Sequence, residues 1–273
     1  MKEKDFIAEL QDLTYLNWTD TKLSPGTPGC FLKAYEENDG VKYYYKLSNY
    51  DSYRGVFGHE NINELIISRF LTILGVEHLE YQLIHALVLI NGKTIETYIT
   101  KSVNFRKKEE RKIAFDVFYD LNKQIDEAPL AFAIRMGWEM YFYQMMAVDY
   151  LICNRDRHGA NIELLVDSNG SVRPAPIFDH GCSLLFSCYS NLKSIEKFDV
   201  MEEGAVNNFI GSRSLEYNLQ LLPKGKKLFK GNLTESDKET LLEGVKSLLP
   251  FQHTEKIWNM LWERWDYFAK ICY

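Results

Sequence analysis

The chain has 273 residues and a formal net charge of −6, which excludes a global basic field of the kind that binds nucleic acid or an anionic membrane. Its composition is 46% hydrophobic and 14% aromatic, which excludes a disordered chain and suits one large domain or two lobes. No apolar run approaches the roughly 20 residues that a membrane helix needs. We therefore expect an ordered globular protein without a membrane span.

The cysteine pattern indicates the compartment. The number of cysteines is odd, their spacing is wide and no CxxC occurs, which favours free thiols in a reducing environment. The cysteines are Cys30, Cys153, Cys182, Cys188 and Cys272. The first five residues lack the apolar core of a signal peptide. The sequence predicts a cytoplasmic protein, and a secreted effector stays open.

The N-terminal segment predicts a loop followed by a hairpin. Residues 1–17 indicate a short helix or an extension. The loop Ser24–Gly29 comes next, and its two prolines lack the backbone donors that bind phosphate, so a phosphate loop and a plain surface turn both stay open. A strand from Cys30, a turn at Asn38-Asp39-Gly40 and a second strand over Val41–Leu47 follow.

A lysine on the second of these strands is a candidate phosphate ligand. In kinases a glycine loop covers the phosphates of the nucleotide, and a lysine two strands along contacts them. Lys46 is the candidate here. Lys42 lies four residues earlier on the same face of the strand, so periodicity leaves it open as the alternative.

The next segment predicts a helix over His59–Leu74, with Gly75 as its natural stop. Either of two carboxylates on one face of this helix could pair with Lys46 and hold it toward the phosphates. Glu64 is preferred over Glu60 because it sits deeper in the helix. The alternative is a pair of exposed acids favoured by the helix dipole.

A lobe boundary follows a run of strands. Residues 76–105 predict strands with a turn at Asn91-Gly92. The charged stretch Arg106–Arg111 then separates an N-terminal lobe, 1–105, from a C-terminal lobe, 106–273. We expect a nucleotide base to lie against this boundary and to hydrogen-bond its backbone.

The C-terminal lobe is predicted to be mainly helical. Helices are expected over 109–125 and, as a long buried helix, over 129–151. Residues 187–230 mix turns and polar residues and suit a substrate-docking segment. Two last helices, over 234–249 and 254–273, are expected to pack on this lobe.

The central motif lies between these helical regions. Asp156 and Asn161 are five positions apart, and Asp179 comes eighteen positions later, after a predicted hairpin over 162–173. The hairpin would bring three oxygen-bearing side chains together, and such ligands suit Mg²⁺. The order Asp, Asn, Asp also matches the kinase pattern of a base followed by two metal ligands. The pattern predicts phosphoryl transfer.

These residues resemble the HipA-like protein kinases, and among them the compact CtkA-like members. The string D-x-L-I-x-N-x-D-R-H-x-x-N over Asp149–Asn161 carries the resemblance, together with Tyr43–Lys46, Glu60–Leu74 and Ala175–Gly181. The resemblance spans roughly residues 24–185. It implies an α+β, two-lobed kinase fold with a small β-rich N-terminal lobe and a mainly helical C-terminal lobe.

The resemblance also implies site roles and ligands. It implies ATP- and Mg²⁺-dependent transfer to Ser or Thr, with Asp156 as catalytic base. Asn161 and Asp179 would hold Mg²⁺, Lys46 would contact the α- and β-phosphates, and Glu64 would hold Lys46. A protein substrate follows from this, autophosphorylation is an expectation, and the toxin members leave room for an antitoxin or other regulatory partner.

Three alternatives remain open at this stage. Phosphatidylinositol kinases use a similar loop, so a lipid or small-molecule kinase is one. A catalytically silent nucleotide-binding pseudokinase is another. A zinc site is the third, from Cys153, His158, His180 and Cys182, although no standard finger spacing fits.

Overall fold

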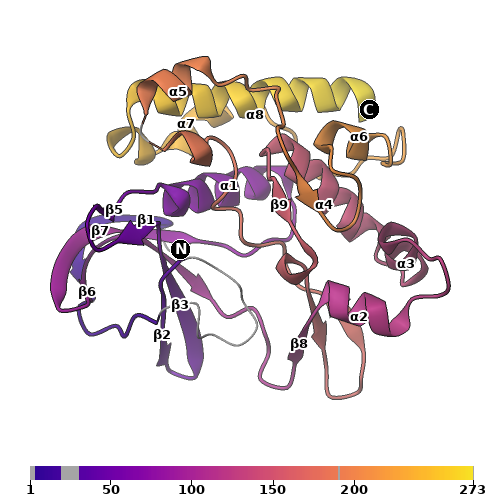
Figure 1. Cartoon of the computed structure of the whole chain (residues 1–273), viewed down its shortest axis with the longest axis horizontal. Coiled ribbons are helices and arrows are strands. Elements are labelled where there is room, and N and C mark those ends of the chain that lie inside the picture. Colours follow the sequence, from indigo (N-terminus) through magenta and orange to yellow (C-terminus); the bar gives the residue numbers. More distant parts are fainter. Residues whose placement is uncertain (1–3, 20–30, 190, 273) are drawn as a thin grey trace.

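A five-stranded sheet forms the first part of this computed structural model, which describes residues 4–19, 31–189 and 191–272. The strands, in sheet order, are β1 (Phe6–Asp12), β6 (Gln82–Ile90), β7 (Lys93–Val103), β3 (Val41–Leu47) and β2 (Lys33–Asn38). Helices make up most of the later part of the chain (Figure 1). The predicted α+β fold is therefore confirmed.

Two tight turns set the register of the antiparallel strands. At the β2–β3 turn, Asp39 and Gly40 have φ of 51° and 75°. At the β6–β7 turn, Asn91 and Gly92 have φ of 51° and 77°. Positive φ at both central residues is what a two-residue hairpin turn of the right twist requires, and Asn, Asp and Gly adopt it most readily. Both turn predictions are confirmed.

Residues 1–17, expected to form a short helix or an extension, contain the strand β1. The helix alternative is therefore wrong. β1 pairs in parallel with β6, with Phe6 opposite Leu83. The sequence signal was weak because a parallel edge strand depends on a partner more than 70 residues away, which no local pattern encodes.

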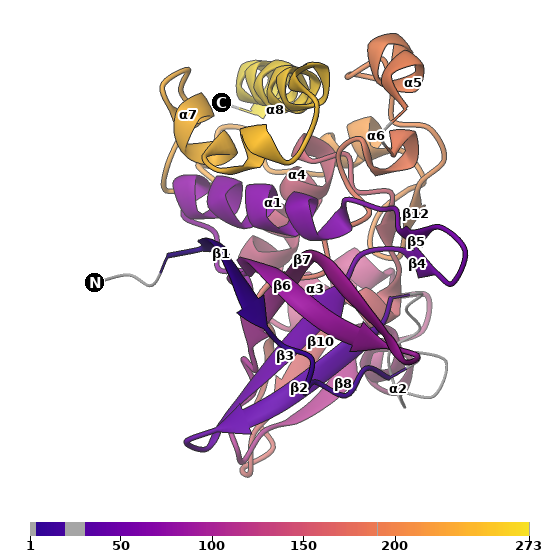
Figure 2. The same ribbon diagram turned by 90° about the vertical axis from the view of Figure 1, so that its left-hand side faces the viewer.

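The helix α1 (Glu60–Leu74) lies between the sheet and the C-terminal helices. It ends at Gly75, whose φ of 68° makes it the expected left-handed cap. All of its residues except Thr72 and Ile73 are buried. Figure 2 shows the reason: the sheet lies on one side of α1, and α7 (Asp237–Leu242) and α8 (Phe251–Cys272) lie on the other.

The C-terminal helices pack on the C-terminal lobe as expected, where α8 contacts α4 and α5, and they also contact α1 directly. Arg69 of α1 donates to the carbonyl oxygens of Leu241 and Glu243, at 3.1 and 2.7 Å. The rings of His59, which precedes α1, and His253 of α8 lie 4.6 Å apart between centroids.

A second, three-stranded sheet positions the central motif. Its order is β11 (Val172–Pro174), β10 (Glu163–Val166) and β8 (Arg111–Ala114). The predicted hairpin of β10 and β11 is confirmed. The predicted helix over 109–125 is wrong at its start, because β8 pairs with β10 and only α2 (Phe115–Asn122) is helical.

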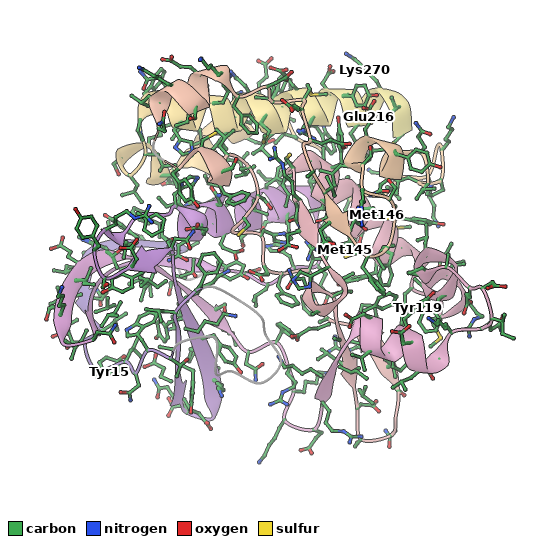
Figure 3. The ribbon with its side chains drawn as sticks, in the orientation of Figure 1. Tyr15, Tyr119, Met145, Met146, Glu216 and Lys270 are labelled. Carbon is green, nitrogen blue, oxygen red and sulfur yellow. The ribbon has the colours of Figure 1, made fainter. Side chains whose placement is uncertain are left out.

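The long helix expected over 129–151 is two helices. α3 (Pro129–Arg135) and α4 (Glu139–Leu151) are separated at Gly137, whose φ of 76° is incompatible with a continuous α-helix. Met145 and Met146 of α4 are buried and lie inside the molecule in Figure 3. The apolar stripe therefore forms core, as core helices do.

Short elements complete the chain. The hairpin β4 (Tyr50–Asp51) and β5 (Gly55–Val56) precedes α1, and β9 (Asp156–Arg157) pairs with β12 (Asn207–Asn208). α5 (Leu192–Lys197) and α6 (Leu215–Leu219) lie in the segment expected to mix turns. The helix expected over 234–249 stops at Leu242, because Gly244 has φ of 73° and only a 3-10 turn over Val245–Ser247 follows.

Among the helices of the described residues, none combines the length and the apolar character that a membrane span requires. The cysteines within that part of the chain, Cys153, Cys182, Cys188 and Cys272, form no disulfide.

Candidate active site

A cavity of about 260 Å³ lies between the five-stranded sheet and the segment that carries the central motif. Three of the predicted site residues line it, namely Lys46, Asn161 and Asp179. Its other lining residues come from β2, β3, β7, β8 and β10 and from the loops that precede or follow strands: Lys33, Tyr44, Tyr45, Leu79, Tyr81, Thr100, Ser102, Val103, Asn104, Phe105, Arg106, Lys112, Ala160, Glu163 and Phe178. Neither Glu64 nor Asp156 lines the cavity, although Glu64 contacts the lining residue Lys46.

Three distant elements meet at Lys46. Its Nζ lies 3.1 Å from Oε1 of Glu64 on α1 and 2.7 Å from Oδ1 of Asp179. The Glu64 side chain is fully buried, whereas 36% of the Asp179 side chain is exposed. Glu64 therefore holds Lys46 from its buried side, whereas Asp179 lines the cavity together with Lys46.

The structure distinguishes between the two pairs of candidates that periodicity left open. The Nζ of Lys42 lies 3.8 Å from the ring centroid of Tyr35 and makes a cation–π contact there, whereas the Nζ of Lys46 pairs with Asp179. The carboxylate of Glu60 accepts from the backbone N–H and the side-chain amide of Asn49, at 3.2 and 2.5 Å. Lys46 and Glu64 are therefore the pair at the cavity.

Opposing charges determine the ionisation of this cluster. Burial disfavours the ammonium of Lys46, but the charges of Asp179 and Glu64 outweigh it and hold its pKa well above the ordinary value. Burial also acts on Asp179, yet the Lys46 charge outweighs it and holds the pKa of Asp179 below the ordinary value. For Glu64 burial dominates and raises the pKa, against the opposing charge of Lys46. The ionised pair facing the cavity is Lys46 with Asp179.

Helix α1 also fixes the backbone that presents Asp179. Glu64 Oε2 accepts from the backbone N–H of His180 at 3.1 Å. Asn63 donates from its side chain to the carbonyl oxygens of Gly181 and Ser183, at 2.9 and 3.0 Å. Asp179 itself has φ of 62°, a left-handed conformation that is uncommon outside glycine and is found at functional sites.

Gly181 allows this close approach of α1. A Cβ at this position would lie 3.0 Å from Cβ of Glu60 and 3.4 Å from its carbonyl oxygen. Both distances are tight for a side-chain carbon, so a larger residue would push the Asp179 segment away from α1.

The side chains present fit the Mg²⁺ ion that the resemblance implies. Asn161 donates from its amide nitrogen to the carbonyl oxygen of Asp156 at 3.1 Å, so its amide oxygen remains available to meet a cation. Asn161 and the partly exposed Asp179 line the same cavity. A carboxylate and an amide oxygen are suitable Mg²⁺ ligands when phosphates supply the rest.

Asp156 is exposed at the strand β9, and its neighbour Arg157 is buried. Arg157 pairs with Asp149 of α4 at 2.9 Å, and their side chains are 1% and 0% exposed. Arg157 also donates to the carbonyl oxygens of Asn161 and Phe178, each at 3.2 Å. It therefore ties the Asp156 loop to the segment that carries Asp179.

The prediction from the residues did not assign this Arg157–Asp149 pair. A signal was available, because Asp149 is the one charged residue in the apolar run from Met145 to Leu151 that ends α4, and a buried charge needs a partner. Asn154 completes the cluster by donating to Oδ1 of Asp149 at 2.8 Å.

The predicted lobe boundary forms part of the cavity wall. Ser102, Val103, Asn104 and Phe105 line it, and the Phe105 and Phe178 rings lie 5.8 Å apart between centroids. The backbone N–H of Asn104 donates to the carbonyl oxygen of Lys42 at 2.8 Å, so it already has a partner within the chain. The predicted phosphate loop Ser24–Gly29 lies outside the described residues.

Within the residues that the structure describes, no three His, Cys, Asp or Glu side chains form a group that could hold a metal ion. The side chains considered for zinc, Cys153, His158, His180 and Cys182, therefore form no such group. His180 instead lies beside Arg157, and burial and that charge hold the pKa of His180 well below its ordinary value.

Comparisons with known proteins identify the fold. No protein-family model matches the sequence, and no curated protein matches it. The crystal structure of the Helicobacter pylori proinflammatory kinase CtkA is similar, with a TM-score of 0.60 and 17% identity over 97% of this chain and 95% of that one. HipA of Shewanella oneidensis MR-1, from a complex of the toxin–antitoxin system HipA, HipB and its operator DNA, has a TM-score of 0.51 and 12% identity over 93% of this chain and 68% of that one.

The chain thus shares its fold, along almost its whole length, with the kinase CtkA and with HipA, and the relationship that its sequence motifs predicted is confirmed at the level of fold.

Proposed function

We propose that the protein is an ATP- and Mg²⁺-dependent phosphotransferase, a serine/threonine protein kinase of the HipA/CtkA-like type. One observation carries the proposal. A single ammonium, Lys46 Nζ, joins Glu64 of α1 to Asp179 at the wall of the cavity. A kinase uses this lysine–glutamate pair and this metal-binding aspartate to hold the phosphates of ATP.

The charge of the cavity suits a polyanion. Lys33 on β2 lies opposite Lys46 on β3 in the strand register, and both line the cavity. Burial, and then the nearby Lys46 charge, lower the pKa of Lys33. A bound triphosphate would neutralise both ammonium groups, which is a favourable exchange in a partly desolvated site.

The chemical step is a displacement at the γ-phosphorus. The oxygen of an acceptor hydroxyl forms a bond to the γ-phosphorus, the bond from that phosphorus to the bridging oxygen of ATP breaks, and ADP leaves. Asp156 accepts the hydroxyl proton, and Lys46 stabilises charge on the phosphates. Mg²⁺, held by Asn161 and Asp179, would supply further neutralisation of the triphosphate.

The proposed acceptor is a Ser or Thr hydroxyl of a protein. Asp156 supports this choice because it is exposed and stands outside the cavity lining, where a macromolecular acceptor can reach it. The neighbour HipA was crystallised with HipB and operator DNA, and a regulatory protein partner is part of the proposal for this chain.

The proposal is tested with γ-labelled ATP and Mg²⁺, offered to the protein alone, with dephosphorylated casein, with host-cell lysate and with phosphatidylinositol vesicles. We expect label on protein. Asp156→Ala should lower the transfer rate by about 10²–10⁴-fold, the usual contribution of a catalytic base, with an unchanged unfolding midpoint. Asp266→Ala is the matched control, since Asp266 is an exposed α8 carboxylate paired with Lys270.

Full labelling by Asp156→Ala would remove Asp156 from the mechanism. Label found in lipid alone would replace the protein acceptor by a lipid. Calorimetric binding of ATP without any turnover by the unmodified protein would overturn the enzymatic function altogether.

A further inference from the structure

The strand that carries Asp156 has a neighbour from a distant part of the chain. β9 pairs in parallel with β12, with Asn207 opposite Asp156 and Asn208 opposite Arg157. The backbone N–H of Asn207 donates to the carbonyl oxygen of Arg155 at 2.7 Å, and that of Phe209 donates to the carbonyl oxygen of Arg157 at 2.9 Å. These two bonds bracket Asp156 and fix its backbone.

The side chains of β9 and β12 lie on two faces of this two-stranded ladder, one exposed and one largely buried. Residues directly opposite each other in a ladder share a face, and successive residues alternate. Asp156 and Asn207 are accordingly both exposed, whereas Arg157 is buried. The amide Nδ2 of Asn207 donates to Oδ1 of Asp156 at 3.2 Å. One carboxylate oxygen of Asp156 is thus held, and Oδ2 is left to meet an acceptor.

The segment that precedes Asn207 is held in place by hydrogen bonds from α8. Arg264 of α8 is fully buried and donates from Nε to the carbonyl oxygen of Val200 at 2.7 Å. It also donates to the carbonyl oxygens of Tyr150, at the end of α4, and of Glu202, at 2.9 and 3.1 Å. The chain therefore enters β12 from a fixed point and meets Asp156 in a set register.

We propose that Asn207 is a positioning residue for phosphoryl transfer, which orients the Asp156 carboxylate toward the acceptor hydroxyl. This inference rests on the proposed function. When the acceptor oxygen attacks the γ-phosphorus, its proton passes to Oδ2 of Asp156, ADP departs, and the amide of Asn207 keeps Oδ1 fixed throughout.

A positioning role and a purely structural role for Asn207 predict different rankings of the transfer rates of three variants. Asn207→Ala removes the donor. Asn207→Asp keeps the shape but replaces the donor by a carboxylate that repels Asp156. Asn207→Ser keeps a shorter donor. The β9–β12 ladder uses backbone groups only, so all three variants retain it. A structural role predicts that the isosteric Asp variant is mildest, whereas a positioning role predicts that it is worst.

The experiment measures single-turnover transfer from γ-labelled ATP to dephosphorylated casein, together with the affinity for a fluorescent ATP analogue and Mg²⁺. We expect nucleotide affinity within about 2-fold of the unmodified protein, since Asn207 does not line the cavity. The transfer rate should fall about 10- to 100-fold in Asn207→Ala, which is what one hydrogen bond to a charged group is worth. It should fall further in Asn207→Asp and least in Asn207→Ser.

The control variant is Asn259→Ala, which truncates an exposed asparagine on α8 and should transfer at the unmodified rate. Equal transfer by the unmodified protein and Asn207→Asp would overturn this inference alone, as would a fall in nucleotide affinity that accounts for the whole loss. An unmodified protein that transfers nothing would overturn the proposed function and this inference with it.

Discussion

Two ion clusters support the cavity, Asp149 with Arg157 and Lys46 with Asp179, and they differ in their exposure. Asp149 and Arg157 are sealed, at 0% and 1% exposure, and Arg157 also donates to the carbonyl oxygens of Asn161 and Phe178. Lys46 and Asp179 keep 13% and 36% exposure and face a cavity. The first cluster is closed to solvent, and the second is open to the cavity.

The comparison explains why similar chemistry has different consequences. A sealed ion pair that loses one member leaves a buried charge without compensation, which is strongly destabilising. A pair that is partly open to water is partly screened, and Lys46 also keeps Glu64 as a partner, so the loss of Asp179 should cost less stability than the loss of Asp149. Charges that fold the site and charges that act on a ligand can therefore be separated by experiment.

The largest expected effect is on the sealed cluster. Asp149→Asn should lower the free energy of unfolding by about 3–5 kcal/mol, because Arg157 remains charged and buried. Urea unfolding followed by circular dichroism measures this. The double variant Asp149→Leu with Arg157→Leu should recover part of that stability without recovering transfer, since the contacts of Arg157 to Asn161 and Phe178 stay lost. A stable Asp149→Asn single variant would contradict the sealed character of the cluster.

The same substitution on the open cluster should separate activity from stability. Asp179→Asn should reduce transfer by about 10²–10³-fold, as the loss of a preorganised charge does, and raise the Mg²⁺ concentration required. Its free energy of unfolding should fall less than that of Asp149→Asn, because the Asp179 carboxylate is partly exposed and Lys46 keeps Glu64 as a partner. Asp149→Asn is the matched comparison. Equal destabilisation by the two variants would erase the difference between the clusters.

A third buried pair, His59 with His253, should give a smaller effect that depends on pH. The described ring nitrogens of both residues have no hydrogen-bond partner. Burial, with the neighbouring His253, lowers the pKa of His59 to about 3, and burial lowers the pKa of His253 to about 4. The nearby carboxylate of Glu60 is already bonded to Asn49.

The direction in which the free energy of unfolding changes with pH follows from the protons bound by the folded and unfolded chains. Below pH 6.5 the unfolded chain binds protons that the folded histidines refuse, so stability falls as the pH drops from about 6.5 toward 4 and then 3. Each histidine contributes a slope of up to about 1.4 kcal/mol per pH unit. His253→Leu should flatten this dependence between pH 6.5 and 4, measured by urea unfolding at several pH values. Gln252→Leu, at an exposed neighbouring position, is the control, and an unchanged slope in His253→Leu would refute the assignment.

Local chemistry determined much of the fold. Asp39-Gly40 and Asn91-Gly92 adopt the positive φ that their hairpins need, and Gly75 ends α1, because these residue types tolerate conformations that others do not. The motif over Asp149–Asn161 was sufficient to anticipate a kinase-like fold. The lobe boundary after residue 105 and the roles of Asp156, Asn161, Asp179, Lys46 and Glu64 remain predictions, now with a geometry that can be tested.

Tertiary structure decided what local pattern could not. Lys46 and Lys42 share a strand face, and only the position of Asp179 separates them. β1 needs β6 as its partner, and Asn207 meets Asp156 across some 50 residues of chain. The C-terminal helices cover α1 because its second apolar face had to be buried somewhere. The sequence by itself determined the two hairpin turns and the end of α1, since each depends on one or two residues that tolerate positive φ. Only the folded chain decided which charges are sealed and which face the cavity, because burial is a property of everything packed around them.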